Sequence, residues 1–298
     1  MDTALIATIK SPAFLKISQG IGGPNERSST LANEIKTLTI SSRSDRPLAV
    51  DSAGDGPAVL LVHGLGFSRK QWRAHLTVLA ANGMRAISVD LRGFGDSELP
   101  DEQYLMDDLA HDLEGLRQQL DVNDFAVVGH SMGGMVTQRY VVNYPNAVRS
   151  LLLASTSSHS GRRAVAFAKA MSLLSEHGFE AAAAQPEVWH EIESAVSSAF
   201  PWNDAMRTVL QRLTARPQAA HALGWNAVSR FSAKDRLHEV KCPTVVMHGN
   251  KDILIPMGLG RLTHQAIAHS QWRENDGGHN FPIEDQQEFM ATLLKFLD

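Results

Sequence analysis

The apolar residues of this chain follow two alternating patterns. One is a short, continuous apolar run, as at residues 58–62 and 125–128, which is typical of a strand buried on both faces. The other is helical spacing with one apolar face, as shown by Leu105, Leu109, Leu113, Leu116 and Leu120. Because the two kinds of run alternate, the chain is predicted to have an α/β fold, with a mostly parallel sheet and helices on both faces.

The two patterns place the expected elements along the sequence. Two short antiparallel strands are expected first, at residues 37–40 and 48–51. Further strands are predicted at residues 58–62, 85–90, 125–128, 150–154, 244–248 and 271–274, and helices at residues 72–81, 105–120, 132–144, 259–268 and 286–297. Pro145 ends the third of these helices, because proline cannot continue helical hydrogen bonding.

Residues 155–235 interrupt the alternation, because they show helical signals and no strand. We expect them to form a helical cap inserted between two parts of one α/β core, residues 36–154 and 236–298. Residues 1–35 have little periodicity and contain a Gly-Gly-Pro-Asn cluster. They are therefore expected to form an N-terminal arm that lies on the body or is partly disordered.

The composition fits a folded protein and narrows its partners. Of 298 residues, 43% are hydrophobic and 20% are charged, which argues against intrinsic disorder. The net charge of −4 gives no basis for binding nucleic acid or an anionic membrane, and the single cysteine, Cys242, excludes an internal disulfide. No signal peptide is evident, and no apolar run approaches the ~20 residues that span a bilayer. A cytoplasmic location is therefore expected.

The segment 127–134, with the sequence VVGHSMGG, carries the first chemical signal. A G-x-S-x-G pattern between a strand and a helix forms a nucleophile elbow, in which a sharp turn projects the serine hydroxyl into a cleft. Gly129 and Gly133 flank Ser131 because a Cβ would clash in so tight a turn. Serine is a weak nucleophile without a neighbouring base, so Ser131 is the candidate nucleophile and a base is expected close to it.

Asp252 and His279 are the candidate acid and base. Ser131, Asp252 and His279 each follow a predicted strand, and ligands of parallel sheets bind beyond the carboxyl ends of the strands. His279 is expected to accept the serine proton, and Asp252 to orient the imidazole. Asp276 and Glu284 lie nearby in sequence and remain alternatives for the acid.

Two backbone amides are expected to bind the negative oxygen of a tetrahedral intermediate. One is the amide of Met132, at the start of the predicted helix after Ser131. The other is the amide of Leu65, in the loop of residues 63–66 that follows a buried strand. His63 and His130 lie beside these amides and are expected to hydrogen-bond to the backbone and to take no part in the chemistry.

Five motifs in chain order resemble those of the α/β-hydrolase superfamily: HGLG at 63–66, DLRGFGDS at 90–97, GHSMGG at 129–134, GNKDILIP at 249–256 and GGHN at 277–280. The resemblance implies an eight-stranded sheet and a catalytic triad of Ser131, Asp252 and His279. A serine nucleophile separates the chain from the dehalogenase and epoxide-hydrolase branches, which use aspartate there. The chain is closer to the esterase, lactonase, haloperoxidase-like and C–C hydrolase branches, although its HGLGFS loop lacks the Gly-Pro-Gly pattern usual in C–C hydrolases.

These features predict a serine hydrolase that cleaves carboxylic ester or lactone bonds of a small to medium, fairly apolar substrate through an acyl-enzyme. C–C bond hydrolysis and a haloperoxidase-like perhydrolase reaction are alternatives that use the same three residues. A ligand-binding module built on the same fold is the non-enzymatic alternative, and a matched base and acid argue against it. No metal or organic cofactor is predicted, because the zincin, Walker and paired CxxC patterns are missing from the sequence.

The predicted cap contains three of the five tryptophans, Trp189, Trp202 and Trp225. We expect these side chains to line the substrate pocket, because aromatic residues commonly form the walls of small-molecule sites. Packing of the cap onto the body is the alternative role for them.

Overall fold

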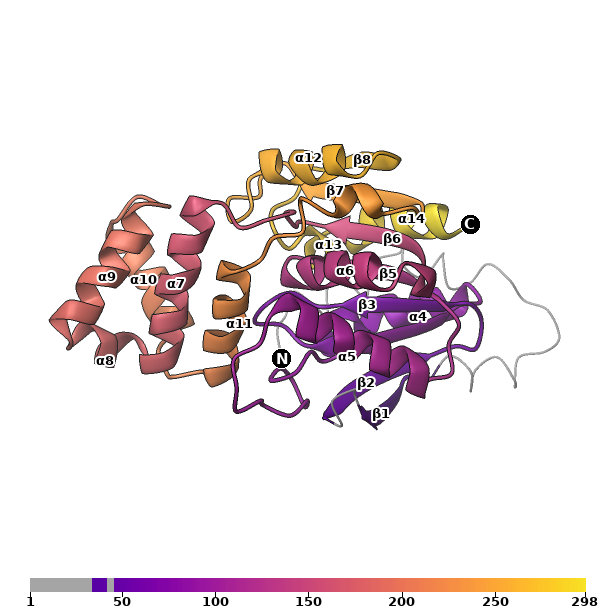
Figure 1. The fold of residues 1–298 in the computed structure, drawn as a ribbon, viewed down its shortest axis with the longest axis horizontal. Helices are drawn as coiled ribbons and strands as arrows, with labels where there is room; N and C mark the ends of the chain where they lie inside the picture. The colour runs from indigo at the N-terminus through magenta and orange to yellow at the C-terminus, as the bar shows by residue number, and fades with distance from the viewer. Residues whose placement is uncertain (1–33, 42–45) are drawn as a thin grey trace.

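One eight-stranded sheet organises the protein (Figure 1). The structure is a computed structural model that describes residues 34–41 and 46–298. The strand order is β1-β2-β4-β3-β5-β6-β7-β8, and the strands are β1 Lys36–Ser41, β2 Pro47–Ala53, β3 Ala58–Val62, β4 Arg85–Val89, β5 Phe125–His130, β6 Val148–Ala154, β7 Thr244–Gly249 and β8 Ser270–Asn275. β2 pairs antiparallel with β1 and β4, and the remaining neighbours are parallel. The expected α/β fold is therefore confirmed, while residues 1–33 of the predicted arm lie outside the described residues.

The strands contribute side chains to two apolar layers, one on each face of the sheet. Leu60 and Val127 belong to one buried cluster, and their chain neighbours Val59 and Ala126 belong to the other. The first layer is covered by α5 Met106–Gln119, α6 Met132–Asn143 and α12 Met257–Ala266, and the second by α4 Arg73–Ala81 and α14 Gln286–Leu297. Burial on both faces explains why the central strands are continuous apolar runs.

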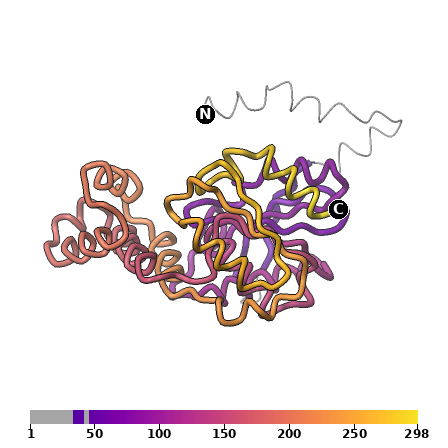
Figure 2. The backbone as a smooth tube through the Cα atoms, turned by 90° about the horizontal axis from the view of Figure 1, so that it is seen from above, coloured from indigo at the N-terminus to yellow at the C-terminus, as the bar shows by residue number. Residues whose placement is uncertain are grey.

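A helical insertion separates β6 from β7. It consists of α7 Arg162–His177, α8 Phe179–Ala183, α9 Pro186–Ser197, α10 Asp204–Leu213 and α11 Ala219–Ser229. Figure 1 shows β6 pointing toward this helical insertion, and Figure 2 shows the insertion projecting from the body. A bridge between His159 and Ser232 joins the entering and leaving chain segments at its base. The helical insertion therefore lies beyond the carboxyl ends of the parallel strands, where ligands bind in such sheets.

The short helices are the elements that the apolar pattern did not predict. They are η1 Arg69–Trp72, η2 Pro145–Ala147, η3 Leu237–Glu239 and α13 Phe281–Glu284. Each spans about one turn, which is too short to show helical periodicity. Within the part of the chain that the structure covers, no helix has the length and apolar character needed to cross a membrane.

Candidate active site

Ser131 occupies a strained turn between β5 and α6. Its φ of 53° and ψ of −119° lie outside the conformations that non-glycine residues usually adopt. The turn is tight, because a Cβ on Gly129 would lie 2.6 Å from the carbonyl oxygen of Gly133, and one on Gly133 would lie 2.4 Å from that of Val62. The two glycines around Ser131 are therefore a packing requirement of the elbow.

His279 joins Ser131 to Asp252 in one hydrogen-bonded row. Asp252 lies in the loop after β7, and His279 lies in the loop between β8 and α13. The Ser131 Oγ is 2.9 Å from His279 Nε2, and the Asp252 Oδ2 is 2.8 Å from His279 Nδ1. Asp276, one of the two alternative acids, instead accepts a hydrogen bond from Asn250 at an exposed position. The structure therefore brings together the three side chains that were expected to meet.

The surroundings of Asp252 keep its carboxyl group ionised. Its Oδ1 accepts hydrogen bonds from the amides of Leu254 and Ile255 at 2.9 and 2.8 Å, and its Oδ2 lies 3.4 Å from His248 Nε2. Burial raises the pKa of Asp252, but the hydrogen bonds from His248, His279 and Ile255 outweigh burial and hold this pKa well below its usual range. A carboxylate held in this way can orient the His279 imidazole and stabilise its protonated form.

Leu65 and Met132, whose amides were expected to bind the oxyanion, line the same cavity as Ser131. Met132 is the first residue of α6, so its amide has no acceptor within the helix. Leu65 lies in the loop between β3 and η1, and His63 supports this loop. The His63 Nδ1 donates to the Gly64 carbonyl at 2.8 Å, and its Nε2 accepts from the Leu91 amide at 3.0 Å. Burial lowers the pKa of His63, which favours the neutral ring that these contacts need, and its expected backbone role is confirmed.

A chain of side-chain hydrogen bonds connects the Leu65 loop to the His279 loop. The Gly64 amide donates to Gln71 Oε1 at 3.4 Å, the Gln71 Nε2 donates to His130 Nδ1 at 3.1 Å, and the His130 Nε2 donates to the His279 carbonyl at 2.9 Å. Burial, reinforced by the nearby His279, lowers the pKa of His130 to about 3, so this ring can accept at one nitrogen and donate at the other. Gln71 was not expected from the sequence, because its partners are far away along the chain.

Buried ion pairs of Arg69 lie next to the loop that carries Leu65. The Arg69 guanidinium lies 2.9 Å from Asp51 and 2.8 Å from Asp96, and it also contacts Asp90. Arg69 itself is 3% exposed, so these carboxylates compensate for the loss of its hydration. The loop that carries Leu65 is thereby tied to the strands behind it.

Comparison with known proteins identifies the family. The profile of the α/β-hydrolase fold family matches residues 57–286. This chain belongs to the α/β-hydrolase fold family. It is 25% identical over 281 residues to the proline iminopeptidase of Lactobacillus helveticus, an alignment that covers 87% of this chain and 92% of its relative.

Two solved structures of hydrolases resemble most of this chain. A thermophilic esterase from Thermogutta terrifontis has a TM-score of 0.69 and 25% identity, and the match covers 88% of this chain and 98% of the esterase. The enol-lactonase from Burkholderia xenovorans LB400 has a TM-score of 0.70 and 22% identity, covering 87% and 99% of the two chains. At that identity the lactonase shows likeness of fold alone.

In this α/β hydrolase, Ser131 and His279 line a cavity of about 970 Å³ between the core and the helical insertion. Most of its wall is apolar, formed by Met135, Phe167, Met171, Phe200, Trp225 and Val228. The volume is in the upper part of the range for small-molecule sites. Among residues 34–41 and 46–298, no group of three or more His, Cys, Asp or Glu side chains is placed to hold a metal ion.

Only one of the three expected tryptophans lines this cavity. Trp225 does so, whereas Trp189 and Trp202 are half-buried and pack against the core of the helical insertion itself. The Trp189 ring packs edge-on against Phe179 and Trp202, with centroids 5.2 and 5.8 Å apart. The assignment of Trp189 and Trp202 to the pocket is therefore corrected: a small helical unit needs its largest apolar side chains to fill its own interior.

Phe167 and Phe200 were not assigned to the pocket from the sequence. Their rings pack edge-on with centroids 5.0 Å apart, and both line the cavity. On α7, the lining residues Ala164, Phe167 and Met171 are three and four positions apart, which is the spacing of one helix face. This spacing is visible in the sequence, but it does not reveal which face of α7 turns toward Ser131.

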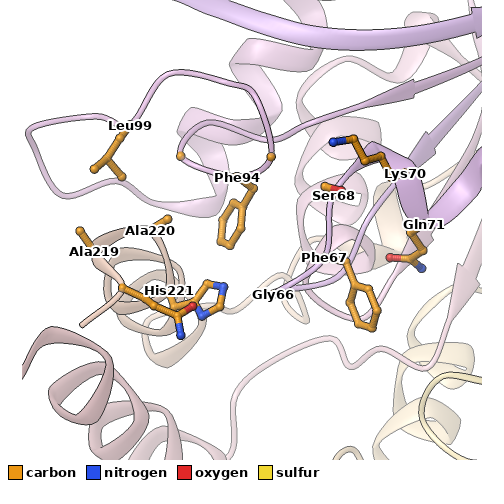
Figure 3. A pocket seen from close by; sticks show the side chains of 13 residues that line it. Gly66, Phe67, Ser68, Lys70, Gln71, Phe94, Leu99, Ala219, Ala220 and His221 are labelled. Carbon is orange, nitrogen blue, oxygen red and sulfur yellow. The ribbon is translucent and has the colours of Figure 1, made fainter. Parts of the chain in front are cut away.

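Figure 3 shows a second cavity, of about 610 Å³, which shares lining residues with the first. Gly66, Phe67 and His221 line both cavities. Figure 3 shows the His221 ring beside Phe94, and the two rings stack at 24° with centroids 5.9 Å apart. Burial lowers the pKa of His221, so a neutral imidazole lies at the junction of the two cavities.

Proposed function

We propose that this protein is a serine hydrolase that cleaves carboxylic ester or lactone bonds through an acyl-enzyme intermediate. The observation that carries the proposal is the row of Ser131, His279 and Asp252, with contacts of 2.9 and 2.8 Å, in an apolar cavity. A nucleophile, a base and an orienting acid within hydrogen-bond distance are what acyl transfer requires.

In the proposed reaction, Ser131 Oγ attacks the substrate carbonyl while its proton passes to His279 Nε2. Asp252 stabilises the resulting imidazolium, and the amides of Leu65 and Met132 donate hydrogen bonds to the oxyanion. His279 then protonates the alcohol oxygen as its bond to the acyl carbon breaks. The alcohol of an ester departs, whereas that of a lactone stays attached to the acyl group on Ser131. A water molecule then attacks the acyl carbon while its proton passes to His279. His279 returns this proton to Ser131 Oγ as the carboxylic acid is released.

The charges around the cavity favour esters and lactones over peptides with a free amino terminus. The name of the L. helveticus relative raises the peptidase alternative. A substrate ammonium group in an apolar cavity needs a carboxylate partner, because an unpaired charge there loses its hydration. None of the described residues that line the cavity is Asp or Glu, so the cavity offers no such partner.

Hydrolysis of p-nitrophenyl butyrate tests the proposal. We expect turnover by the wild type and a fall in kcat of about 10⁴-fold or more in Ser131→Ala, with the residual rate coming from binding and the oxyanion amides. Ser194→Ala is the matched control, because Ser194 is exposed on α9. Near-normal turnover by Ser131→Ala, or no turnover of esters and lactones by the wild type, contradicts the proposal.

Covalent labelling tests the acyl-enzyme separately. A fluorophosphonate should add once to the wild type, and peptide mass spectrometry should locate the adduct on Ser131. An adduct on another residue contradicts the assignment. Peracid formation after addition of hydrogen peroxide would instead assign the acyl-enzyme to a perhydrolase reaction.

A further inference from the structure

Charge is distributed unevenly around the cavity that contains Ser131. Apart from histidines, the ionisable side chains among its described lining residues are those of Arg162 and Arg163, at the start of α7. The cavity wall is therefore positive in a protein whose net charge is −4. Such a reversal of sign concentrates anions locally, where the molecule as a whole would repel them.

Among the residues that the structure describes, no carboxylate is paired with these two guanidinium groups. Within the described ranges, the side chains of Arg162 and Arg163 form no hydrogen bond or ion pair, and the first turn of α7 contains no acidic residue. Arg139, by comparison, pairs with Asp107 at 2.6 Å. Cations in the first turn of a helix also face the positive end of the helix dipole, so a bound anion would relieve an unfavourable arrangement.

Both arginines are exposed to solvent as well as lining the cavity, which places them at its mouth. Phe167 and Met171 follow on the same helix and, with Trp225 from α11, form part of the apolar wall of this cavity. A ligand that contacts both the arginines and Ser131 therefore lies in a mainly apolar cavity.

We propose that Arg162 and Arg163 bind an anionic group of the substrate, such as a carboxylate, that an apolar spacer separates from the scissile ester or lactone bond. The guanidinium group suits this role, because it stays charged and can bind a carboxylate through two parallel hydrogen bonds. The inference rests on the proposed function and adds the class of substrate. The anion can belong to the acyl part or to the leaving group.

A pair of matched esters tests the inference by kinetics. The p-nitrophenyl ester of hexanoic acid and the mono-p-nitrophenyl ester of adipic acid have acyl chains of equal length and differ in a terminal carboxylate. We expect the ratio of their kcat/KM values, adipate over hexanoate, to fall by about ten-fold or more in the double variant Arg162→Gln/Arg163→Gln. For the alcohol side, 4-carboxyphenyl hexanoate is compared with phenyl hexanoate in the same way.

The matched control is Arg212→Gln, which removes an exposed charge from α10 of the helical insertion at a position outside the cavity lining. This variant should leave both ratios within about two-fold of the wild type. An added 0.5 M KCl should lower the rate with the anionic ester more than with its neutral partner. If the double variant changes neither ratio while the wild type turns over the neutral esters, the inference is wrong and the proposed function stands.

Binding to Ser131→Ala, measured by calorimetry, decides the question without turnover. We expect monomethyl adipate to bind at least about ten-fold more tightly than methyl hexanoate, or 4-carboxyphenyl hexanoate than phenyl hexanoate. The preference should disappear when Arg162→Gln and Arg163→Gln are added. Equal affinities within both pairs, or a preference that survives the loss of the arginines, would overturn the inference even if no ester were hydrolysed.

Discussion

The two sides of the cavity around Ser131 are built in different ways. On the core side, polar side chains are fixed by specific partners, as His279 is by Asp252 and His130 is by Gln71. On the side of the helical insertion, the wall consists mainly of apolar side chains such as Phe167 and Trp225, which are held by packing.

This difference suggests a division of roles: the core side carries out the proposed chemistry, and the insertion side selects the substrate. Hydrogen bonds from rigid strands and helix ends can hold reacting atoms within tenths of an ångström, which proton transfer and oxyanion binding require. An apolar wall held by packing discriminates ligands by size, shape and the few charges at its edge. Changes on the core side should therefore alter kcat for every substrate, and changes on the insertion side should alter which substrate is preferred.

The largest expected effect is on the core side, at His279. His279→Ala should lower kcat by about 10⁴-fold or more, because Ser131 loses its base. The double variant Ser131→Ala/His279→Ala should be little worse than either single variant, since the two residues act as one unit. Steady-state kinetics on one p-nitrophenyl ester checks this. If the free-energy losses of the two single variants add up in the double variant, Ser131 and His279 act independently and the prediction is wrong.

Asp252 should have the next largest effect. Asp252→Asn keeps the shape of the side chain but removes the charge that stabilises the His279 imidazolium, so kcat/KM should fall by about 10²- to 10⁴-fold. Asp276→Asn is the control, because Asp276 is exposed and bonds to Asn250, and it should change activity by less than about two-fold. A greater loss from Asp276→Asn than from Asp252→Asn would show that the acid is misassigned.

Two tryptophans of the helical insertion should give opposite results. Trp225→Ala opens the cavity wall, so it should change the preference among p-nitrophenyl esters of increasing acyl length by about ten-fold or more. Trp189→Ala removes the packing of this half-buried ring against the core of the insertion and should lower Tm while keeping the preference profile. Rates across the ester series and melting curves for both variants provide the measurement. A changed profile in Trp189→Ala would contradict the placement of this side chain against the core of the insertion.

The smallest expected effect concerns stability of the core at acid pH. The His75 ring is buried between Trp72 and Phe289, and its Nε2 donates to the Pro282 carbonyl at 2.9 Å. Burial lowers the pKa of His75 from 6.5 to about 4. The His75 imidazole is therefore protonated more readily in the unfolded chain than in the folded protein. The stability that neutral His75 confers is full above pH 6.5 and is lost as the pH falls toward 4.

The free energy of unfolding, measured with urea at pH 7 and pH 5, checks this dependence. In the wild type, His75 alone should account for a loss of about 2 kcal/mol between the two pH values. His75→Gln should remove that part of the loss, whatever its effect at pH 7. His190→Gln changes an exposed histidine of α9 and is the control. An unchanged pH dependence in His75→Gln would contradict the prediction.

The core side of the site could be predicted from the sequence because its residues obey local rules. Gly129 and Gly133 are required by the contacts of a single turn, and the ends of neighbouring parallel strands must meet at one edge of the sheet. Those two rules bring Ser131, Asp252 and His279 together from distant parts of the chain. Backbone partners for His63 and His130 follow from the same crowding.

The insertion side could not be predicted in the same way. Trp189, Trp202 and Trp225 are the same residue type, and the sequence around them does not distinguish a pocket role from a packing role. Their roles depend on how α7 to α11 pack against one another and against the core. An apolar helix face shows only that something covers it, and both the cavity and the core of the insertion satisfy that need. Gln71 was missed for a related reason, because a glutamine in a one-turn helix such as η1 has no local signature until its distant partners are known.

A chain of hydrogen bonds runs from the Gly64 amide through Gln71 and His130 to the carbonyl of His279. It links the loop that carries Leu65 to the loop that carries His279. His130 directly precedes Ser131 in the chain, so the same hydrogen bonds also hold the turn that carries Ser131. In the proposed mechanism, a small displacement of the Leu65 loop would be passed to His279 through the His130 imidazole, so that the loop, the nucleophile and the base would shift together. Such coupling would keep the proposed oxyanion donors, nucleophile and base aligned with one another, whichever ligand fills the apolar side of the cavity.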